Sequence, residues 1–278
     1  MAIPIWKNAF FFYQSIPPPH MKLHSLSLTP LILTGMVGNL SAALIGHWAF
    51  DEGVGTTTAD SSGNGNTGVF AGGVTWGSGG PGGNYAVIDG TPNSVVDPTV
   101  TLPAMTTTND FTWAFWANNQ EVIGGPQQNS IMIGNRYNET GTDYAPRQFV
   151  KFTPTKFEWH QEAGGADNQD YDDLVVGEWH HHAVVKTGTS VHYYRDGVAV
   201  GDPGTLNTSL ANAAAMRFFM GGNTGTASAN EVFNGYLDDV RIYDNALSAN
   251  EINALVVPEP SSLLLGALGL GMLLRRKR

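Results

Sequence analysis

The sequence predicts an all-β fold, an antiparallel sandwich or jelly roll made of two sheets. Only 14% of the residues are charged, 10% are aromatic and 34 are glycine, which is typical of short strands joined by tight turns. Between residues 44 and 256, short apolar runs alternate with Gly, Asn, Asp and Pro, and no long segment has a helical period. Asp196-Gly197 separates two such runs and indicates a type I′ hairpin.

The expected strands are short and regularly spaced, as in sandwiches and jelly rolls. They cover residues 45–50, 85–88, 111–117, 130–134, 148–152, 156–161, 178–186, 191–195, 217–220 and 235–243. One helix is expected to begin at Ser248, because Ser248 and Glu251 have the spacing of a capping box and Ile252 and Leu255 follow on one face. The composition does not shift within residues 44–256, so we expect one domain there.

Composition also excludes several functional classes. The net charge of −10 argues against nucleic-acid binding, which favours a basic surface. The absence of cysteine excludes a disulfide scaffold and a zinc–thiolate site. The aromatic content is higher than expected of a disordered chain.

The N-terminal region predicts a secretory signal peptide over residues 21–43. A basic start at Lys22 precedes a largely apolar run over residues 26–37, and the small residues Ser41 and Ala43 suit a cut after Ala43. The preceding segment matches nothing that follows, so we expect Met21 to be the true start and residues 1–20 to be a non-native extension.

The C-terminal region, residues 257–278, predicts a membrane-sorting tail. Its elements in order are Pro258, Glu259 and Pro260, an apolar run over residues 261–274, and a basic end that includes Arg275 and Arg276. The apolar run would span about 21 Å as a helix, which is short for a bilayer core. The basic end would stay cytoplasmic, leaving the domain outside and transiently anchored in the inner membrane.

This tail resembles the PEP-CTERM sorting signal. The resemblance implies that a membrane-embedded exosortase recognises the tail and cuts near the motif. It also implies a diderm bacterium and a destination in the cell envelope or extracellular polysaccharide matrix. An ordinary C-terminal anchor is the alternative, with the same localisation and no cleavage.

Four segments of the middle region, in order, are similar to laminin-G-like domains of the concanavalin A-like type. They are residues 47–65, with the strings HWAFDEG and DSSGNG; residues 110–116, DFTWAFW; residues 177–197, opening GEWHH and closing YRDG; and residues 233–248, with FNGYLDDVRIY and ALS. The resemblance implies two curved antiparallel sheets packed face to face. It does not fix the function, because such domains serve binding, structure and catalysis alike.

One structural calcium ion is expected from this resemblance, held by Asp238 with Asp60 as a second ligand. Asp60 lies in a glycine-rich loop near the first strand and Asp238 in the last strand, and these strands are neighbours in the family. Carboxylates converging from loops suit a hard cation. The alternative is turn chemistry, in which Asp and Asn bond their own backbone.

A glycan-binding surface would use aromatic side chains, for which Trp116, Trp159 and Tyr137 are the leading candidates, with Trp76 and Tyr144 also near loops. The alternative is that these rings form the core. Along residues 111–117, alternation places Phe111, Trp113 and Phe115 on one face and Trp116 on the other, and the sequence leaves open which face is core.

Two further patterns could indicate chemistry. Glu158, His160 and Glu162 share one strand face, and related glycoside hydrolases use Glu-x-Asp-x-Glu there. His160 replaces the central Asp of that pattern, and a solvated face with Phe157 and Trp159 pointing inward is the alternative. In the string 180–182, alternation points His181 away from its neighbours, so the three histidines cannot converge on one ion, although His180 and His182 could. The hairpin of laminin-G-like domains has a similar Trp-His-His string, and this resemblance implies a packing role.

These observations predict a non-enzymatic cell-surface or matrix protein whose domain binds polysaccharide or a protein partner. Two alternatives remain: a glycoside hydrolase using Glu158 and Glu162, and a purely structural envelope protein.

Overall fold

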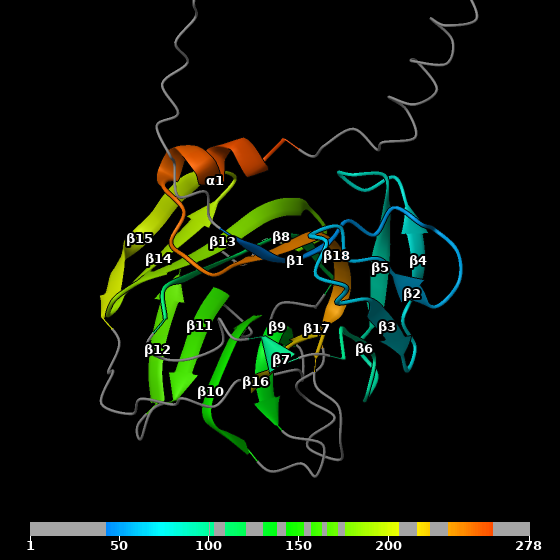
Figure 1. The fold of residues 1–278 in the computed structure, drawn as a ribbon, viewed down its shortest axis with the longest axis horizontal. Coiled ribbons are helices and arrows are strands. Elements are labelled where there is room, and N and C mark those ends of the chain that lie inside the picture. The colour runs from blue at the N-terminus through cyan, green and yellow to red at the C-terminus, as the bar shows by residue number, and fades with distance from the viewer. Residues whose placement is uncertain are drawn as a thin grey trace, which may run out of the picture. The chain divides into compact units, whose positions relative to one another are not determined.

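The fold is a sandwich of two antiparallel sheets, seen in a computed structural model of the chain (Figure 1). The residues described are 43–99, 101–102, 109–120, 130–137, 143–152, 157–162, 166–171, 176–205, 216–222 and 233–257. The expectations for residues 1–20, for the signal peptide up to residue 42 and for the tail from Pro258 lie outside them. Among the described residues, no helix is long and apolar enough to cross a membrane.

The first sheet is built around the last strand of the chain. Its order is β15 (Val198–Thr205), β14 (Ser190–Arg195), β13 (Trp179–Thr187), β8 (Phe111–Asn119), β18 (Asn234–Tyr243), β5 (Asn84–Asp89) and β4 (Thr75–Ser78), and β1 (Leu44–Trp48) also pairs with β18. The expected pairing of the first and last strands is therefore confirmed.

The second sheet packs against the first. Its order is β12 (Ala166–Tyr171), β11 (Phe157–Glu162), β10 (Asp143–Phe152), β9 (Ser130–Tyr137), β17 (Phe219–Met220), β6 (Val95–Asp97), β3 (Gly68–Ala71) and β2 (Thr57–Thr58). A separate pair joins β16 (Met216–Arg217) to β7 (Thr101–Leu102). The all-β prediction is confirmed.

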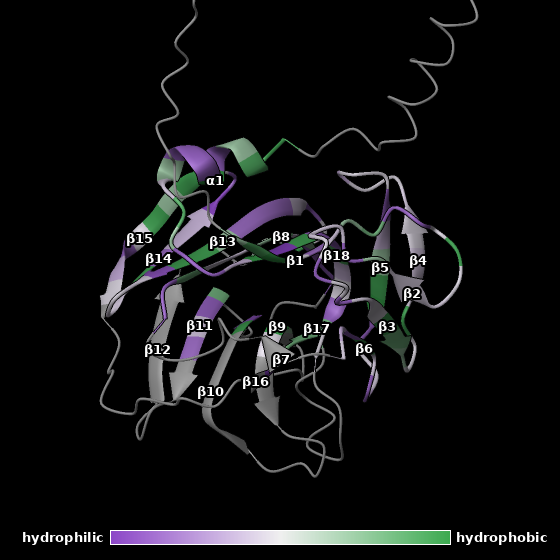
Figure 2. Cartoon of the chain, viewed as in Figure 1, coloured by the Kyte–Doolittle hydropathy of each residue, from purple (hydrophilic) through white to green (hydrophobic). Residues whose placement is uncertain are grey.

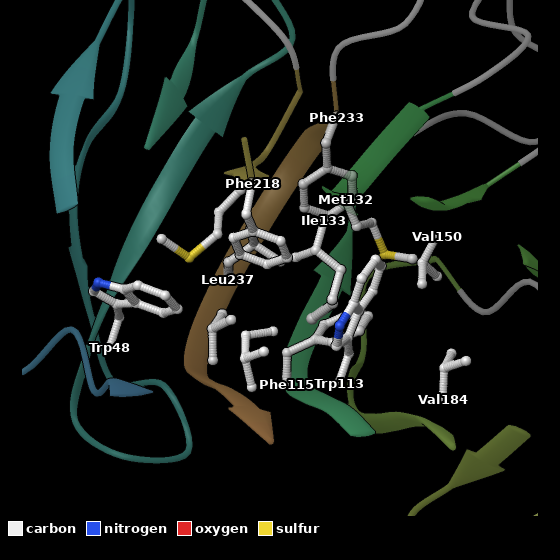
Figure 3. Close-up of a cluster of buried hydrophobic side chains, with 14 of the residues drawn as sticks. Trp48, Trp113, Phe115, Met132, Ile133, Val150, Val184, Phe218, Phe233 and Leu237 are labelled. Carbon is white, nitrogen blue, oxygen red and sulfur yellow. The ribbon is translucent and has the colours of Figure 1, made fainter. Parts of the chain in front are cut away.

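The main core lies between the sheets. Phe111, Trp113 and Phe115 are fully buried there, which settles the face that the sequence left open. Trp113 and Phe115 lie among side chains of other strands such as Val150 and Leu237 (Figure 3). Burying each large apolar side chain contributes about 1.5–3 kcal/mol, so this cluster supplies most of the driving force for folding.

A smaller core lies on the outer face of the first sheet, which is the face turned away from the second sheet. There Leu247 and Ile252 pack on Ala114, Ala183 and Val185. Ile252 belongs to α1 (Ala249–Leu255), whose apolar residues show as green patches in Figure 2. The helix therefore covers one part of this outer face.

The predicted turn and cap are both present. Asp196 and Gly197 have φ values of 51° and 78°, as a type I′ turn between β14 and β15 requires. At the start of α1, the Ser248 side chain accepts from the Glu251 backbone N–H and the Glu251 carboxylate accepts from the Ser248 N–H, forming the capping box.

Candidate functional site

The part of the outer face that α1 leaves uncovered holds a row of three side chains on neighbouring strands. His181 of β13 pairs with Trp116 of β8, and Trp116 pairs with Asp238 of β18. His181 Nδ1, Trp116 Nε1 and Asp238 Oδ1 are buried and have no hydrogen-bond partner among the residues that the structure describes. Because buried polar groups are normally hydrogen-bonded, this row needs an explanation.

Asp238 is the most unusual of the three. Its side chain is 0% exposed, and its Oδ2 accepts a hydrogen bond of 2.9 Å from the backbone N–H of Gly82. Burial raises the pKa of Asp238 to about 7, with the neighbouring carboxylates Asp239 and Asp51 adding to the shift. A buried carboxylate oxygen without a donor is costly unless the proton is retained or a cation lies beside it.

A glycine-rich turn over residues 79–83, here named the glycine strap, lies over this carboxylate. The backbone N–H groups of Gly79 and Gly80 both donate to the Gly83 carbonyl. A Cβ atom at Gly80 would lie 2.8 Å from the Tyr85 ring and 3.2 Å from Asp238 Oδ2. Only glycine allows the strap to approach so closely.

Asp51 and Asp239 complete the acidic surroundings. A Cβ atom at Gly83 would lie 3.5 Å from Asp51 Oδ1, so Asp51 borders the strap. The pKa of Asp51 is raised by burial and by the nearby carboxylates Glu52 and Asp239. Asp239 lies at a bulge with φ 47°, and its Oδ1 is 2.7 Å from His47 Nε2 and accepts 2.9 Å from Arg241 Nε.

The predicted calcium ligands therefore have different environments. Asp60 Oδ1 accepts from the backbone N–H groups of His47 and Ser62, and Oδ2 accepts from that of Asn66. Although burial opposes it, these hydrogen bonds lower the pKa of Asp60. Asp60 thus organises the loop after β1, while Asp238 keeps an oxygen without a donor. Among the described residues, no three His, Asp or Glu side chains converge as a metal site.

Aromatic rings gather beside the strap. Tyr85, Trp179 and Tyr236 come from three strands, with ring centroids 5.1 Å apart for Tyr85–Trp179, 5.0 Å for Tyr85–Tyr236 and 6.0 Å for Trp179–Tyr236. All three are half-buried, as is Trp116. Trp116 makes an edge contact with the His181 ring at 5.5 Å. The part of the outer face that α1 leaves uncovered is therefore aromatic, with the carboxylate of Asp238 buried beneath the strap.

The structure corrects one candidate of the glycan surface. Trp159 is 0% exposed and its ring centroid lies 5.1 Å from that of Trp113 in the main core, so it cannot form part of a surface. Tyr137 ends β9, and its side chain lies outside what the structure describes. Trp76 is half-buried and packs 4.7 Å from the Phe70 ring. Of the three leading candidates, only Trp116 is shown with a partly exposed ring.

Strand β11 confirms one part of the non-catalytic alternative, the inward direction of Phe157 and Trp159, but the face of Glu158 and His160 is nearly buried and not solvated. Phe157 and Trp159 point into the core, and Glu158 and His160 lie on the other face. Glu158 Oε1 lies 2.8 Å from Lys151 Nζ and 4.0 Å from His160 Nδ1, with the side chains of all three nearly buried. Glu162 is the last residue of β11, and its side chain is not among those described.

The three adjacent histidines alternate in direction, with the ring centroids of His180 and His182 6.4 Å apart and His181 pointing the other way. His182 faces inward, 2.5 Å from Tyr193 Oη, and stacks on Phe157. His181 faces outward, next to Trp116. His180 Nδ1 lies 2.7 Å from Asp196 Oδ2. Each ring thus has a different environment, and the expected packing role fits His182 best.

Sequence reasoning missed the glycine strap and the Tyr85–Trp179–Tyr236 cluster. The string GSGGPGG over residues 77–83 is typical of a turn, but nothing local relates it to Asp238. Tyr236 and Trp179 lay within recognised strands, and their common face emerges only from the pairing of β18, β8 and β13.

The sorting residues Pro258, Glu259, Pro260, Arg275 and Arg276 lie outside the described residues.

Comparison with known families identifies the fold. A family model described as the concanavalin A-like lectin/glucanases superfamily matches residues 89–253. The chain belongs to the concanavalin A-like lectin/glucanase superfamily. A second family model, the PEP-CTERM protein-sorting motif, matches residues 256–278 of this superfamily member. The motif indicates an exported protein of the cell envelope or extracellular space of a Gram-negative bacterium, recognised by an exosortase.

Several solved structures are similar in fold to this superfamily member, among them a domain of an arabinanase and two binding domains. Domain 4 of AbnA, a GH43 extracellular arabinanase from Geobacillus stearothermophilus solved with arabinotriose, is 20% identical with a TM-score of 0.55, covering 77% of this chain and 98% of that one. The binding domain of Paraclostridial Mosquitocidal Protein 1 is 16% identical with a TM-score of 0.57, covering 77% and 52%. The botulinum neurotoxin serotype G binding domain is 14% identical with a TM-score of 0.58, covering 77% and 50%. At these identities the likeness shows the fold alone. A search of curated protein sequences found no significant match.

Proposed function

We propose that the protein is a non-enzymatic cell-surface or matrix protein whose jelly roll binds polysaccharide on the uncovered part of its outer face. The observation that supports this most is the gathering of four half-buried rings, Trp116, Tyr85, Trp179 and Tyr236, on this face around the buried Asp238. Sugar rings bind to aromatic faces supplemented by a few directed polar groups, and this face supplies the aromatic rings.

The structural neighbours support a binding role. The arabinanase domain was solved with arabinotriose, and two other neighbours are described as binding domains of toxins. These properties belong to those proteins. What they share with the present chain is the fold, and a binding role is the one that we propose for this chain.

We also propose one structural calcium ion at Asp238. The buried Oδ1 has no donor, Asp51 borders the same strap, and carboxylates with loop carbonyl groups are the ligands that calcium prefers. Asp238 and Asp51 would hold the ion, and Asp60 would keep the neighbouring loop in place. The ion would neutralise the buried carboxylate of Asp238 and would fasten the strap to the last strand.

The polar face of β11 supports the non-enzymatic assignment. A retaining glycosidase needs two carboxyl groups about 5–5.5 Å apart with independent roles as nucleophile and acid. Glu158 is paired with Lys151 at 2.8 Å, which holds it as a charged structural group. His160 occupies the position of the central acid. These features favour an ion-pair network on this face over a hydrolytic centre.

The test is glycan binding by the mature protein on a carbohydrate array, followed by calorimetric titration of the strongest ligand. We expect Trp116→Ala to weaken binding at least about tenfold, since stacked aromatic anchors dominate such sites. Val198→Ala, at an exposed valine of β15, is the matched control and should bind normally. If no glycan binds, or if Trp116→Ala binds like wild type, the proposal is wrong.

A further inference from the structure

The folded domain and the sorting tail meet without a spacer. The sorting motif begins at residue 256, and Val256 is the C-cap of α1. Only Val257, which is 72% exposed, separates this cap from Pro258. A residue that precedes proline avoids helical geometry, which explains why the helix stops here. The tail therefore starts directly at the end of a docked helix.

The last turn of α1 rests on the β14–β15 hairpin. A Cβ atom at Gly197 would lie 2.6 Å from Asn253 Oδ1 and 3.1 Å from Val256 Cγ2, so the turn and the helix end are in close contact. Gly197 has φ 78°, which suits glycine at this turn.

The two ends of α1 are held with different strength. The first turn has the capping box and Ile252, which is 0% exposed. The cap stabilises the first turn by satisfying a backbone N–H, and the burial of Ile252 stabilises it by removing apolar surface from water. In the last turn, Asn253 and Ala254 are exposed and Leu255 is half-buried. The last turn can therefore open locally while Ile252 keeps the helix start in place.

The short length of chain between α1 and the apolar run makes this local opening relevant to sorting. From Val256 to Ser261, where the apolar run begins, the extended chain spans at most about 17 Å. A protease in the membrane must bind the tail within this distance, next to the folded domain. Releasing residues 253–256 from helical to extended geometry adds about 7 Å of chain.

We propose that the last turn of α1 must leave the β14–β15 hairpin before the exosortase can process the tail, so that helix docking regulates release from the membrane. This rests on the sorting role of the tail and is independent of glycan binding. The partner is a membrane-embedded peptidase that takes up extended chain, in keeping with the preference of proteolysis for locally unfolded segments.

A reversible cross-link tests the proposal on the full chain, which contains no cysteine. A Cβ atom at Gly197 would lie 3.2 Å from the Asn253 Cα, so the pair Gly197→Cys and Asn253→Cys is close enough for a disulfide. Processing is followed by pulse-chase in inner-membrane vesicles that contain the exosortase, with and without reductant. Wild type with reductant and the single variant Asn253→Cys are the controls.

We expect the oxidised double variant to be processed at least about tenfold more slowly than the same protein after reduction, because the bridge removes the locally open state. Inserting Gly-Ser-Gly-Ser between Val257 and Pro258 of the bridged protein should restore the rate. Because each comparison is made within one variant, a folding defect from Gly197→Cys cannot imitate the result. Equal rates in the oxidised and reduced states would overturn the proposal. A wild-type chain that is never processed would overturn the sorting role and this inference with it.

Discussion

Asp238 Oδ2 accepts a hydrogen bond from the backbone N–H of Gly82, a residue 156 positions earlier in the chain. The bond joins the glycine strap to the last strand and leaves Oδ1 of the same carboxylate buried without a donor. The strap and the last strand thus meet at a carboxylate of which only one oxygen, Oδ2, has a donor among the described residues.

Removing calcium should lower the stability of the mature protein. A ligand present at about 100 times its Kd stabilises the native state by about 2.7 kcal/mol, which corresponds to about 5–10 °C in Tm for a domain of this size. We expect Tm to fall by this amount in EDTA and to recover with added calcium. Asp238→Asn should melt at one temperature in both conditions. An EDTA-independent Tm in wild type would remove the metal.

His181 should make the protein sensitive to acid. Burial lowers the pKa of His181 to about 4, from an ordinary value of 6.5. Between these values the unfolded chain binds a proton that the native state does not, so stability rises with pH and is lost as pH falls from about 6.5 to 4. The full effect is about 3 kcal/mol. His181→Phe should flatten this part of the urea-denaturation profile, and an unchanged profile would assign the acid sensitivity elsewhere.

Trp159→Ala should lower the stability of the domain and leave its glycan affinity unchanged. The ring is fully buried against Trp113 and Phe111, so its removal leaves a cavity that costs about 3–5 kcal/mol. Urea unfolding should show this loss. Where the variant remains folded, its glycan affinity should equal that of wild type, in contrast to Trp116→Ala. A selective loss of affinity with normal stability would restore Trp159 as a ligand residue.

The capping box should contribute measurably to the domain. Ser248→Ala removes the acceptor of the Glu251 N–H, and loss of an N-cap costs about 1 kcal/mol. Equilibrium unfolding in urea should show this loss, while Ser248→Asp, which retains a capping acceptor, should remain near wild type. A cost as large for Ser248→Asp would show that the cap itself is not responsible.

The sequence predicted local features better than the positions of side chains across the sheets. The hairpin at Asp196-Gly197 and the cap at Ser248 were predictable because both depend on residues close in sequence. The direction of Trp116 was not, because alternation alone makes both faces of β8 equivalent. The choice depends on the second sheet packing on one face and α1 covering only part of the other.

The candidate site was predictable only in part for the same reason. Asp238 and Asp60 look alike in sequence, as carboxylates in or near turns. They differ because Asp60 finds two backbone donors in its own loop and a third on the nearby strand β1, whereas Asp238 depends on a distant strap. Burial of this kind is a property of the folded sheet, and no short motif contains it.

The position of β18 has a consequence for export. This last strand fills the middle of the first sheet, between β8 and both β5 and β1. A chain that crosses a membrane with its N-terminus leading brings β18 through after every other strand. Until then β1 and β5 have no partner from β18 in this sheet, so the native contacts of highest sequence separation form last. We therefore expect this topology to delay folding until nearly all of the domain has reached the far side of the membrane, which favours translocation of an unfolded chain.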